Sequence, residues 1–140
     1  MTSVLDLYAA ALVRLQAIPH VSTYEGTVPE QPPADEFGYV YPYLVLYPTP
    51  GHYPYDTAAS LAASSGPELD WLVQVTCVGG TQDRCLQAAD AARGALVGQE
   101  LLPFAGPLVE QQINIYPQVD RAVKPPRIFL PLQLRCMTSA

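Results

Sequence analysis

The stretch from Leu69 to Gly98 most constrains the fold, because a strand pattern and a helix pattern follow each other there with two glycines between them. LDWLVQVTCV alternates between two faces, one of which would carry Trp71, Val73, Val75 and Cys77. Gly79 and Gly80 break this strand, and Thr81 is a suitable N-cap for a helix over 82–97. The helix of such a unit packs on the sheet that contains its strand, so the Trp71 face should lie beneath it.

The remaining apolar patterns predict one more helix and three more strands. The first helix is expected over 4–18, where apolar residues recur at three-to-four spacing before Pro19. The other strands are expected over 43–47, 108–116 and 128–136. The order α-β-β-α-β-β predicts a single α+β domain over residues 1–140. Its four-stranded sheet would be mainly antiparallel or mixed, with both helices packed on one face.

Three long connections separate these elements, over 19–38, 48–67 and 117–126. Prolines, glycines and acidic residues in the first predict an extended connection without regular structure. The second has no convincing period, and loops of that length in compact domains are usually functional. The third should be the polar tip of an antiparallel hairpin made by the last two strands.

Charge is distributed unevenly along the chain. The formal net charge is −6, to which residues 1–70 contribute −7 and residues 71–140 contribute +1. A chain this acidic, with no run of Lys or Arg, has no electrostatic footprint for tight binding to nucleic acid. No stretch reaches the roughly 20 apolar residues that cross a bilayer, and residues 1–18 do not have the pattern of a signal peptide. We therefore expect neither a tight nucleic-acid ligand nor a membrane partner.

Residues that could perform catalysis or hold a metal ion are scarce. His20 and His52 both fall in loops, where a surface side chain is the default. HExxH, CxxC, GxSxG and phosphate-loop patterns are absent, and the Gly79–Thr81 turn does not have the glycine spacing of a dinucleotide fingerprint. The three cysteines fall in predicted strands and a helix, which is typical of reduced, buried thiols. We therefore expect no enzyme activity, no cofactor and no metal site.

Several segments, taken in order, resemble a known family. The chain begins with a helix of the type VLDLYAAALVRLQAI and continues with the proline-containing strand YPYLVLYPTPG. A strand and helix, WLVQVTCVGGTQDRCLQAADAARGALVG, then precede a β-hairpin near the C-terminus. This pattern over residues 1–140 is similar to that of the tail terminator proteins of long-tailed bacteriophages, which are minor tail or tube-completion proteins.

The resemblance implies a structural virion protein at the head-proximal end of a phage tail, assembled in the host cytoplasm. Such proteins form a hexameric ring that stops growth of the tail tube and provides the docking surface for the neck. The implied partners are further copies of the chain, the tail tube protein and the neck or connector protein. DNA would be only the transiting genome.

Two other interpretations remain open. A head-tail connector or neck completion protein would have a similar size. A small cytosolic α+β enzyme or ligand-binding domain would need a deep pocket with converging polar groups, and the sequence offers no such set.

A ring of this kind would require contact surfaces and an acidic or neutral lumen. The expected contact residues of the two later loops are His52, Tyr53, Tyr55, Arg121, Lys124 and Arg127. The basic hairpin tip should face an acidic surface of a neighbouring subunit formed by Glu30, Asp35 and Glu36. The candidate lumen residues are Asp56, Glu68, Asp70 and Asp120.

Overall fold

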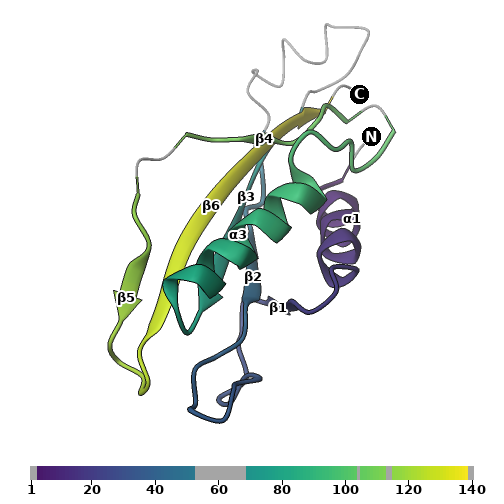
Figure 1. The fold of residues 1–140 in the computed structure, drawn as a ribbon. Coiled ribbons are helices and arrows are strands. Elements are labelled where there is room, and N and C mark those ends of the chain that lie inside the picture. Colours follow the sequence, from purple (N-terminus) through teal and green to yellow (C-terminus); the bar gives the residue numbers. More distant parts are fainter. Residues whose placement is uncertain (1–2, 53–68, 104, 113–114, 139–140) are drawn as a thin grey trace, which may run out of the picture.

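The sheet is built around β3 (Leu69–Gly79), which is antiparallel to β2 (Tyr43–Pro48) on one side and to β6 (Arg127–Thr138) on the other (Figure 1). The computed structural model describes residues 3–52, 69–103, 105–112 and 115–138. Its six-stranded mixed sheet has the order β1-β2-β3-β6-β4, and β5 also pairs with β6. The predicted α+β class and these three strands are confirmed, with strand ends moved by one or two residues.

Strand pairing collects apolar side chains on one face of the sheet. Val75 of β3 lies opposite Leu46 of β2 and Leu132 of β6, and all three are buried. Trp71 lies on the same face and is fully buried. Its indole N–H donates to the carbonyl oxygen of Thr49 at 2.9 Å, so its polar atom is satisfied inside the core.

Both helices, α1 (Val4–Gln16) and α3 (Gln82–Leu96), cover that face (Figure 1). Ser3 caps α1 by accepting from the Asp6 N–H at 3.1 Å, and the Thr81 hydroxyl caps α3. The fully buried alanines are Ala11 of α1 and Ala88, Ala89 and Ala92 of α3. Because alanine is small, α3 approaches the sheet closely. The prediction that both helices pack on one face is confirmed.

The opposite face of the sheet carries a second, smaller apolar cluster. Its buried members are Val40, Tyr43, Val45 and Val78, and Tyr24, Val28 and Phe129 pack against them. Polar side chains such as Gln74 and the exposed Gln133 occupy the middle of the same face. The apolar part of this face is therefore the part that the segment after β1 covers, through Val28 and Val40.

The connection 19–38 was predicted to be irregular, and this is wrong for four residues. β1 (Ser22–Glu25) pairs parallel with β2, with Ser22 opposite Tyr43. Tyr8 of α1 donates a hydrogen bond to Glu25, which ties the new strand to the first helix. A strand of four residues is stabilised mainly by pairing with a neighbouring strand, so its own sequence is too short a pattern to predict it.

The predicted strand over 108–116 is also wrong in extent. Among the described residues of that segment, 108–112 and 115–116, only Val109–Glu110 form a strand, β4. β5 (Gln118–Asp120) pairs further along β6, inside the segment expected to be a turn. The Gln111 N–H donates to the Gln133 carbonyl at 2.8 Å, but Pro131, two residues earlier in β6, has no N–H to donate to a further partner. The outer partner of β6 is therefore interrupted.

The short β4 is fastened to α3 by an ion pair. The Arg93 guanidinium contacts the Glu110 carboxylate through two of its nitrogens, at 2.9 Å from Nη2 and 3.1 Å from Nε. Two-point contacts of this kind fix orientation as well as distance. The pair therefore holds β4 at its place on the sheet edge.

Val75 offers a sharp test of this architecture, because it is fully buried between the sheet and the helices. Val75→Asp should abolish the cooperative thermal transition, since an unpaired buried charge costs more than a domain's marginal stability allows. Gln133→Asp, on the exposed part of the opposite face, is the matched control and should unfold cooperatively. A folded Val75→Asp protein by circular dichroism would contradict this assignment of the core.

Candidate assembly surfaces

The cysteines and histidines do not form a reactive centre in the part of the chain that the structure describes. Burial raises the pKa of the Cys77 thiol to about 12, and the pKa values of the Cys85 and Cys136 thiols to about 11. Protonated, buried thiols are poor nucleophiles at neutral pH. Within residues 3–52, 69–103, 105–112 and 115–138, no group of three His, Cys, Asp or Glu side chains could hold a metal ion. His20 and His52 are both exposed.

A small closed loop, residues Pro33–Tyr41, crosses the N-terminal end of α3, and we call it the arm. Its backbone is closed by hydrogen bonds from the Asp35 N–H to the Tyr39 carbonyl at 2.9 Å and from the Tyr41 N–H to the Pro33 carbonyl at 3.0 Å. The arm is therefore an ordered loop that the sheet and α3 present to solvent.

Gly79 and Gly80 allow the arm and the helix to meet at the end of β3. A Cβ on Gly80 would lie 2.7 Å from the backbone nitrogen of Val40, and one on Gly79 would lie 2.5 Å from the Cβ of Arg84. Neither contact is sterically possible without a shift of backbone. Gly80 thus allows close packing of the arm, and Gly79 allows close packing of the first turn of α3.

Arg84 fastens the arm to α3. Its Nη2 is 3.0 Å from a carboxylate oxygen of Asp35, and its Nη1 donates to the Tyr39 carbonyl at 3.0 Å. The guanidinium also lies 4.8 Å from the centre of the Tyr41 ring, within the range of a cation–π contact. A further hydrogen bond reaches the Val40 carbonyl at 3.3 Å, so this one side chain contacts four residues of the arm.

Asp35 completes this attachment from within the arm. Its carboxylate accepts from the Phe37 N–H at 2.9 Å and from the Tyr39 N–H at 3.0 Å. Burial pushes the pKa of Asp35 upward, but these two N–H groups and the Arg84 guanidinium together hold it below its ordinary value. Asp35 was predicted to belong to an acidic contact surface; within its own subunit its carboxylate binds Arg84 and two N–H groups of the arm.

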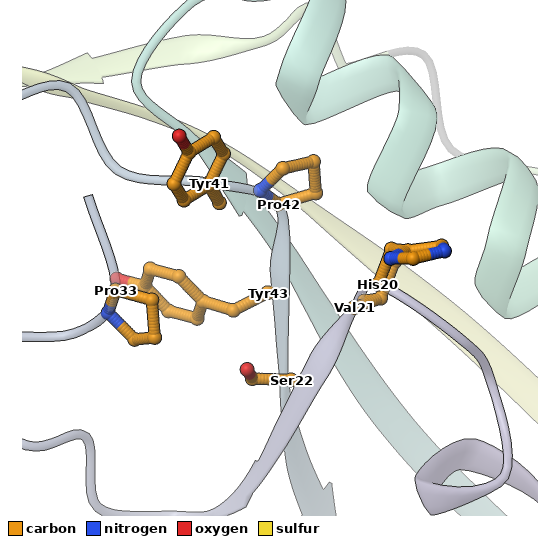
Figure 2. Close-up of a pocket in the computed structure, with 7 residues that line it drawn as sticks. All are labelled: His20, Val21, Ser22, Pro33, Tyr41, Pro42 and Tyr43. Atoms are coloured by element: carbon orange, nitrogen blue, oxygen red, sulfur yellow. The ribbon is translucent and has the colours of Figure 1, made fainter. Parts of the chain in front are cut away.

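The arm presents aromatic side chains to solvent. Phe37 is 73% exposed, and Tyr39 and Tyr41 are 40% and 46% exposed. Beside them lies a cleft of about 490 Å³, lined by Pro33, Tyr41, Pro42, Tyr43 and residues 20–22. In Figure 2 Pro33, Tyr41 and the Tyr43 ring gather on one side of β2, and His20 lies on the other. This lining suits contact with another surface more than chemistry on a small substrate.

The basic hairpin tip, residues 121–126, lies next to the arm in the same subunit. Pro125 is 3.3 Å from the position that a Cβ on Gly38 would take. Arg121 and Lys124 are exposed, whereas Arg127 donates to the Tyr43 hydroxyl at 3.2 Å. The arm and the hairpin tip thus touch within one subunit, and the acidic contact candidates Glu30 and Glu36 are exposed.

Asp70 was predicted to face a lumen, but it is only 3% exposed and is neutralised by Arg135. The Arg135 Nε donates to one carboxylate oxygen at 2.7 Å, and its Nη2 donates to the other. These hydrogen bonds hold the pKa of Asp70 below its ordinary value of 3.8. The exposed His52 lies beside the pair, with Nε2 at 3.8 Å from Asp70.

Four of the predicted residues, Tyr53, Tyr55, Asp56 and Glu68, lie outside the described residues. Asp120 is half-buried beside Arg127 in a small hollow on the face of the sheet away from the helices. Sequence reasoning missed Arg84 and Arg135. An indirect signal existed for Arg84 alone. The helix dipole disfavours a cation in the first turn of α3, so an acidic residue close to Arg84 in space was to be expected.

Comparison with known proteins identifies the fold but no family. No family model matches the chain, and no curated protein matches it. Among solved structures, a chain from the "Virion of native gene transfer agent (GTA) particle" has a similar fold, with a TM-score of 0.57 and 17% sequence identity. The match covers 94% of this chain and 93% of that chain.

Neither helix of the described part is long and apolar enough to cross a membrane.

Arg84→Met should release the arm while leaving the fold of the sheet intact. The substitution removes the contact to Asp35 and the hydrogen bonds to the Tyr39 and Val40 carbonyls. We expect amide exchange over residues 35–41 to accelerate by at least about tenfold, because an opening cost of roughly 1.4 kcal/mol corresponds to that factor. Arg121→Met, at the exposed hairpin tip, is the control. Equal exchange rates in the two variants would contradict the role of Arg84.

The ion pair of Asp70 and Arg135 predicts a pH dependence of stability. Because the pKa of Asp70 is lowered on folding, its contribution is complete above pH 3.8 and is lost as the pH falls through the folded-state pKa. Asp70→Asn should lower the unfolding temperature at pH 7 by roughly 4 °C or more and flatten the acid limb of the profile. Asp90→Asn, at an 82% exposed side chain, should change neither. Parallel acid limbs for all three proteins would contradict the assignment.

Proposed function

We propose that this protein is a structural virion protein, a tail terminator that forms a ring at the head-proximal end of a phage tail tube. The ring ends tube growth and provides the docking surface for the neck. The observation that carries the proposal is the similarity in fold, over nearly the whole of both chains, to a chain of the virion of a gene transfer agent particle. The order of helix and strand motifs along residues 1–140 supports the same assignment.

The distribution of polar side chains supports an assembly role. Arg84, Arg93 and Arg135 are engaged in ion pairs that hold the arm, β4 and the start of β3. Within the described residues, the exposed side chains include large aromatic and aliphatic groups and several charges without an ion-pair partner. A subunit that recognises copies of itself and other virion proteins needs such surfaces rather than converging catalytic groups.

The net charge suits contact with DNA that only passes through. A chain with a formal charge of −6 repels phosphate, so a genome can move through a ring without being held. Asp120 is the remaining described candidate for a lumen position, because the charge of Asp70 is neutralised by Arg135. The proposed partners are further copies of the chain, the tail tube protein and the neck or connector protein, in the tail of a virion assembled in the host cytoplasm.

The first test is the mass and shape of the purified full-length chain. We expect light scattering to give about six copies of the 15.2 kDa chain, and negative-stain images to show rings. The rings should not bind duplex DNA at 150 mM salt, since the surface lacks a basic footprint. A monomer at all accessible concentrations would contradict the proposed ring.

A second measurement separates a terminator from a neck or connector protein. Purified tail tube protein should stop elongating when rings are added at one per tube end, and tube lengths in electron micrographs should shorten with increasing ring concentration. A connector would leave the tube length unchanged. That result would assign the ring to the neck instead.

A further inference from the structure

A groove on the outer side of α1 presents an exposed apolar surface. Leu5 is 73% exposed and Val13 is 67% exposed, and the exposed Ala9 lies between them at four-residue spacing, so the three share one face of the helix. The groove has a volume of about 740 Å³. Among the described residues, its apolar lining includes Ala9, Ala10, Val13, Leu101, Leu102 and Pro103.

The arm is the other prominent apolar surface, and it protrudes. Phe37 at its apex is as exposed as Leu5, at 73%. Its backbone N–H is held by Asp35, which is in turn held by Arg84. Because the loop is already ordered, Phe37 can enter a partner at little cost in conformational entropy.

The arm and the groove lie at different ends of the subunit. In Figure 1 the arm, between β1 and β2, is at the bottom, whereas α1 and the segment after α3 that completes the groove are at the upper right. The arm of one copy therefore does not reach its own groove. A protrusion and a groove on separate surfaces of one chain make a head-to-tail contact, which closes into a ring when the rotation permits.

Charges at the rims of these two surfaces are complementary. Within the described residues Arg14, in the groove, has no carboxylate partner; it donates only to the Gln99 side-chain oxygen and the Glu100 backbone carbonyl, both at 3.3 Å. Asp6 lies eight residues earlier on α1, about 12 Å along the helix. The groove thus has a positive end and a negative end.

The arm carries the matching pair. Glu36, next to Phe37, is exposed and forms no ion pair within the part of the chain that the structure describes. On the other side the hairpin tip packs against the arm through Pro125 and Gly38, and it presents the exposed Lys124. An acidic and a basic group therefore flank the aromatic protrusion.

We propose that the arm of one copy docks in the α1 groove of the next copy, with Phe37 between the helix and residues 101–103. In this arrangement Glu36 faces Arg14 and Lys124 faces Asp6. The two opposite charge pairs select a single orientation of the arm in the groove. This inference rests on the proposed ring, and it names the subunit contact that builds it.

Phe37→Ala in the full-length chain tests the contact directly. An aromatic anchor that fills a partner groove is a hot spot, so each subunit contact should weaken by roughly 30-fold or more. Light scattering and sedimentation should then show a shift from assembly to monomer. Tyr116→Ala removes another aromatic side chain, which is 86% exposed and lies outside both surfaces, and it should assemble normally. Unchanged assembly of Phe37→Ala would overturn the proposal.

Charge reversal provides a second test that does not depend on loss of packing. Arg14→Glu and Glu36→Arg should each weaken assembly, because each places like charges together in the groove. The double variant restores opposite charges and should recover assembly to within about threefold of the natural chain. No recovery in the double variant would overturn the proposed orientation. Circular dichroism should show the same fold for all variants, since both side chains are at the surface.

These measurements separate this contact from the proposed function. Rings that persist in Phe37→Ala would leave the terminator proposal intact and overturn the arm–groove contact. Assembly that depends on Phe37 but has the mass of an open chain or a dimer would support the contact and overturn the ring. If Phe37→Ala keeps its rings and loses only neck binding, the arm docks on another protein, and the proposal for a second copy is overturned.

Discussion

Burial of β3 is the constraint on which the rest of the structure depends. One face of this strand packs beneath both helices, and its two edges pair with β2 and β6 along most of their lengths. The two ends of β3 make different contacts. Asp70 at the start is held by Arg135, and Gly79 and Gly80 at the other end allow the arm to lie against α3. A change in the position of β3 would therefore move the arm and the Asp70–Arg135 pair as well as the core.

The few basic residues divide into structural and exposed sets, and this division shapes the surface. Three arginines hold separate parts of the fold by ion pairs. Arg127 donates to the Tyr43 hydroxyl. Arg14, Arg121 and Lys124 form no ion pair among the residues that the structure describes, which have a larger number of exposed carboxylates. Basic side chains without an ion-pair partner are fewer than exposed carboxylates. The position of each such basic side chain therefore strongly influences how two copies of the chain can approach each other.

The elements that sequence reasoning located correctly are those with long, regular periods. β3 and α3 followed from alternation in LDWLVQVTCV and three-to-four spacing after Thr81, and the same kind of signal located α1, β2 and β6. β1, β4 and β5 were missed or misplaced because each has four or fewer residues and owes its existence to a longer partner strand. The predicted pairing of the basic tip with an acidic surface of a neighbouring subunit stays a prediction; within one chain, Pro125 of the tip lies against Gly38 of the arm.

The sequence by itself determined the α+β class, the central strand-turn-helix unit, the buried face of β3 and the acidic character of the surface. These properties follow from local periodicity and composition, which need no knowledge of distant contacts. Only the tertiary structure decided that Arg84 binds the arm and that Arg135 neutralises Asp70, because the partners are 49 and 65 residues apart in the chain. Such ion pairs depend on which segments the sheet places side by side. The burial of apolar side chains over the whole domain sets which segments become neighbours, so this cannot be predicted from any single stretch of residues.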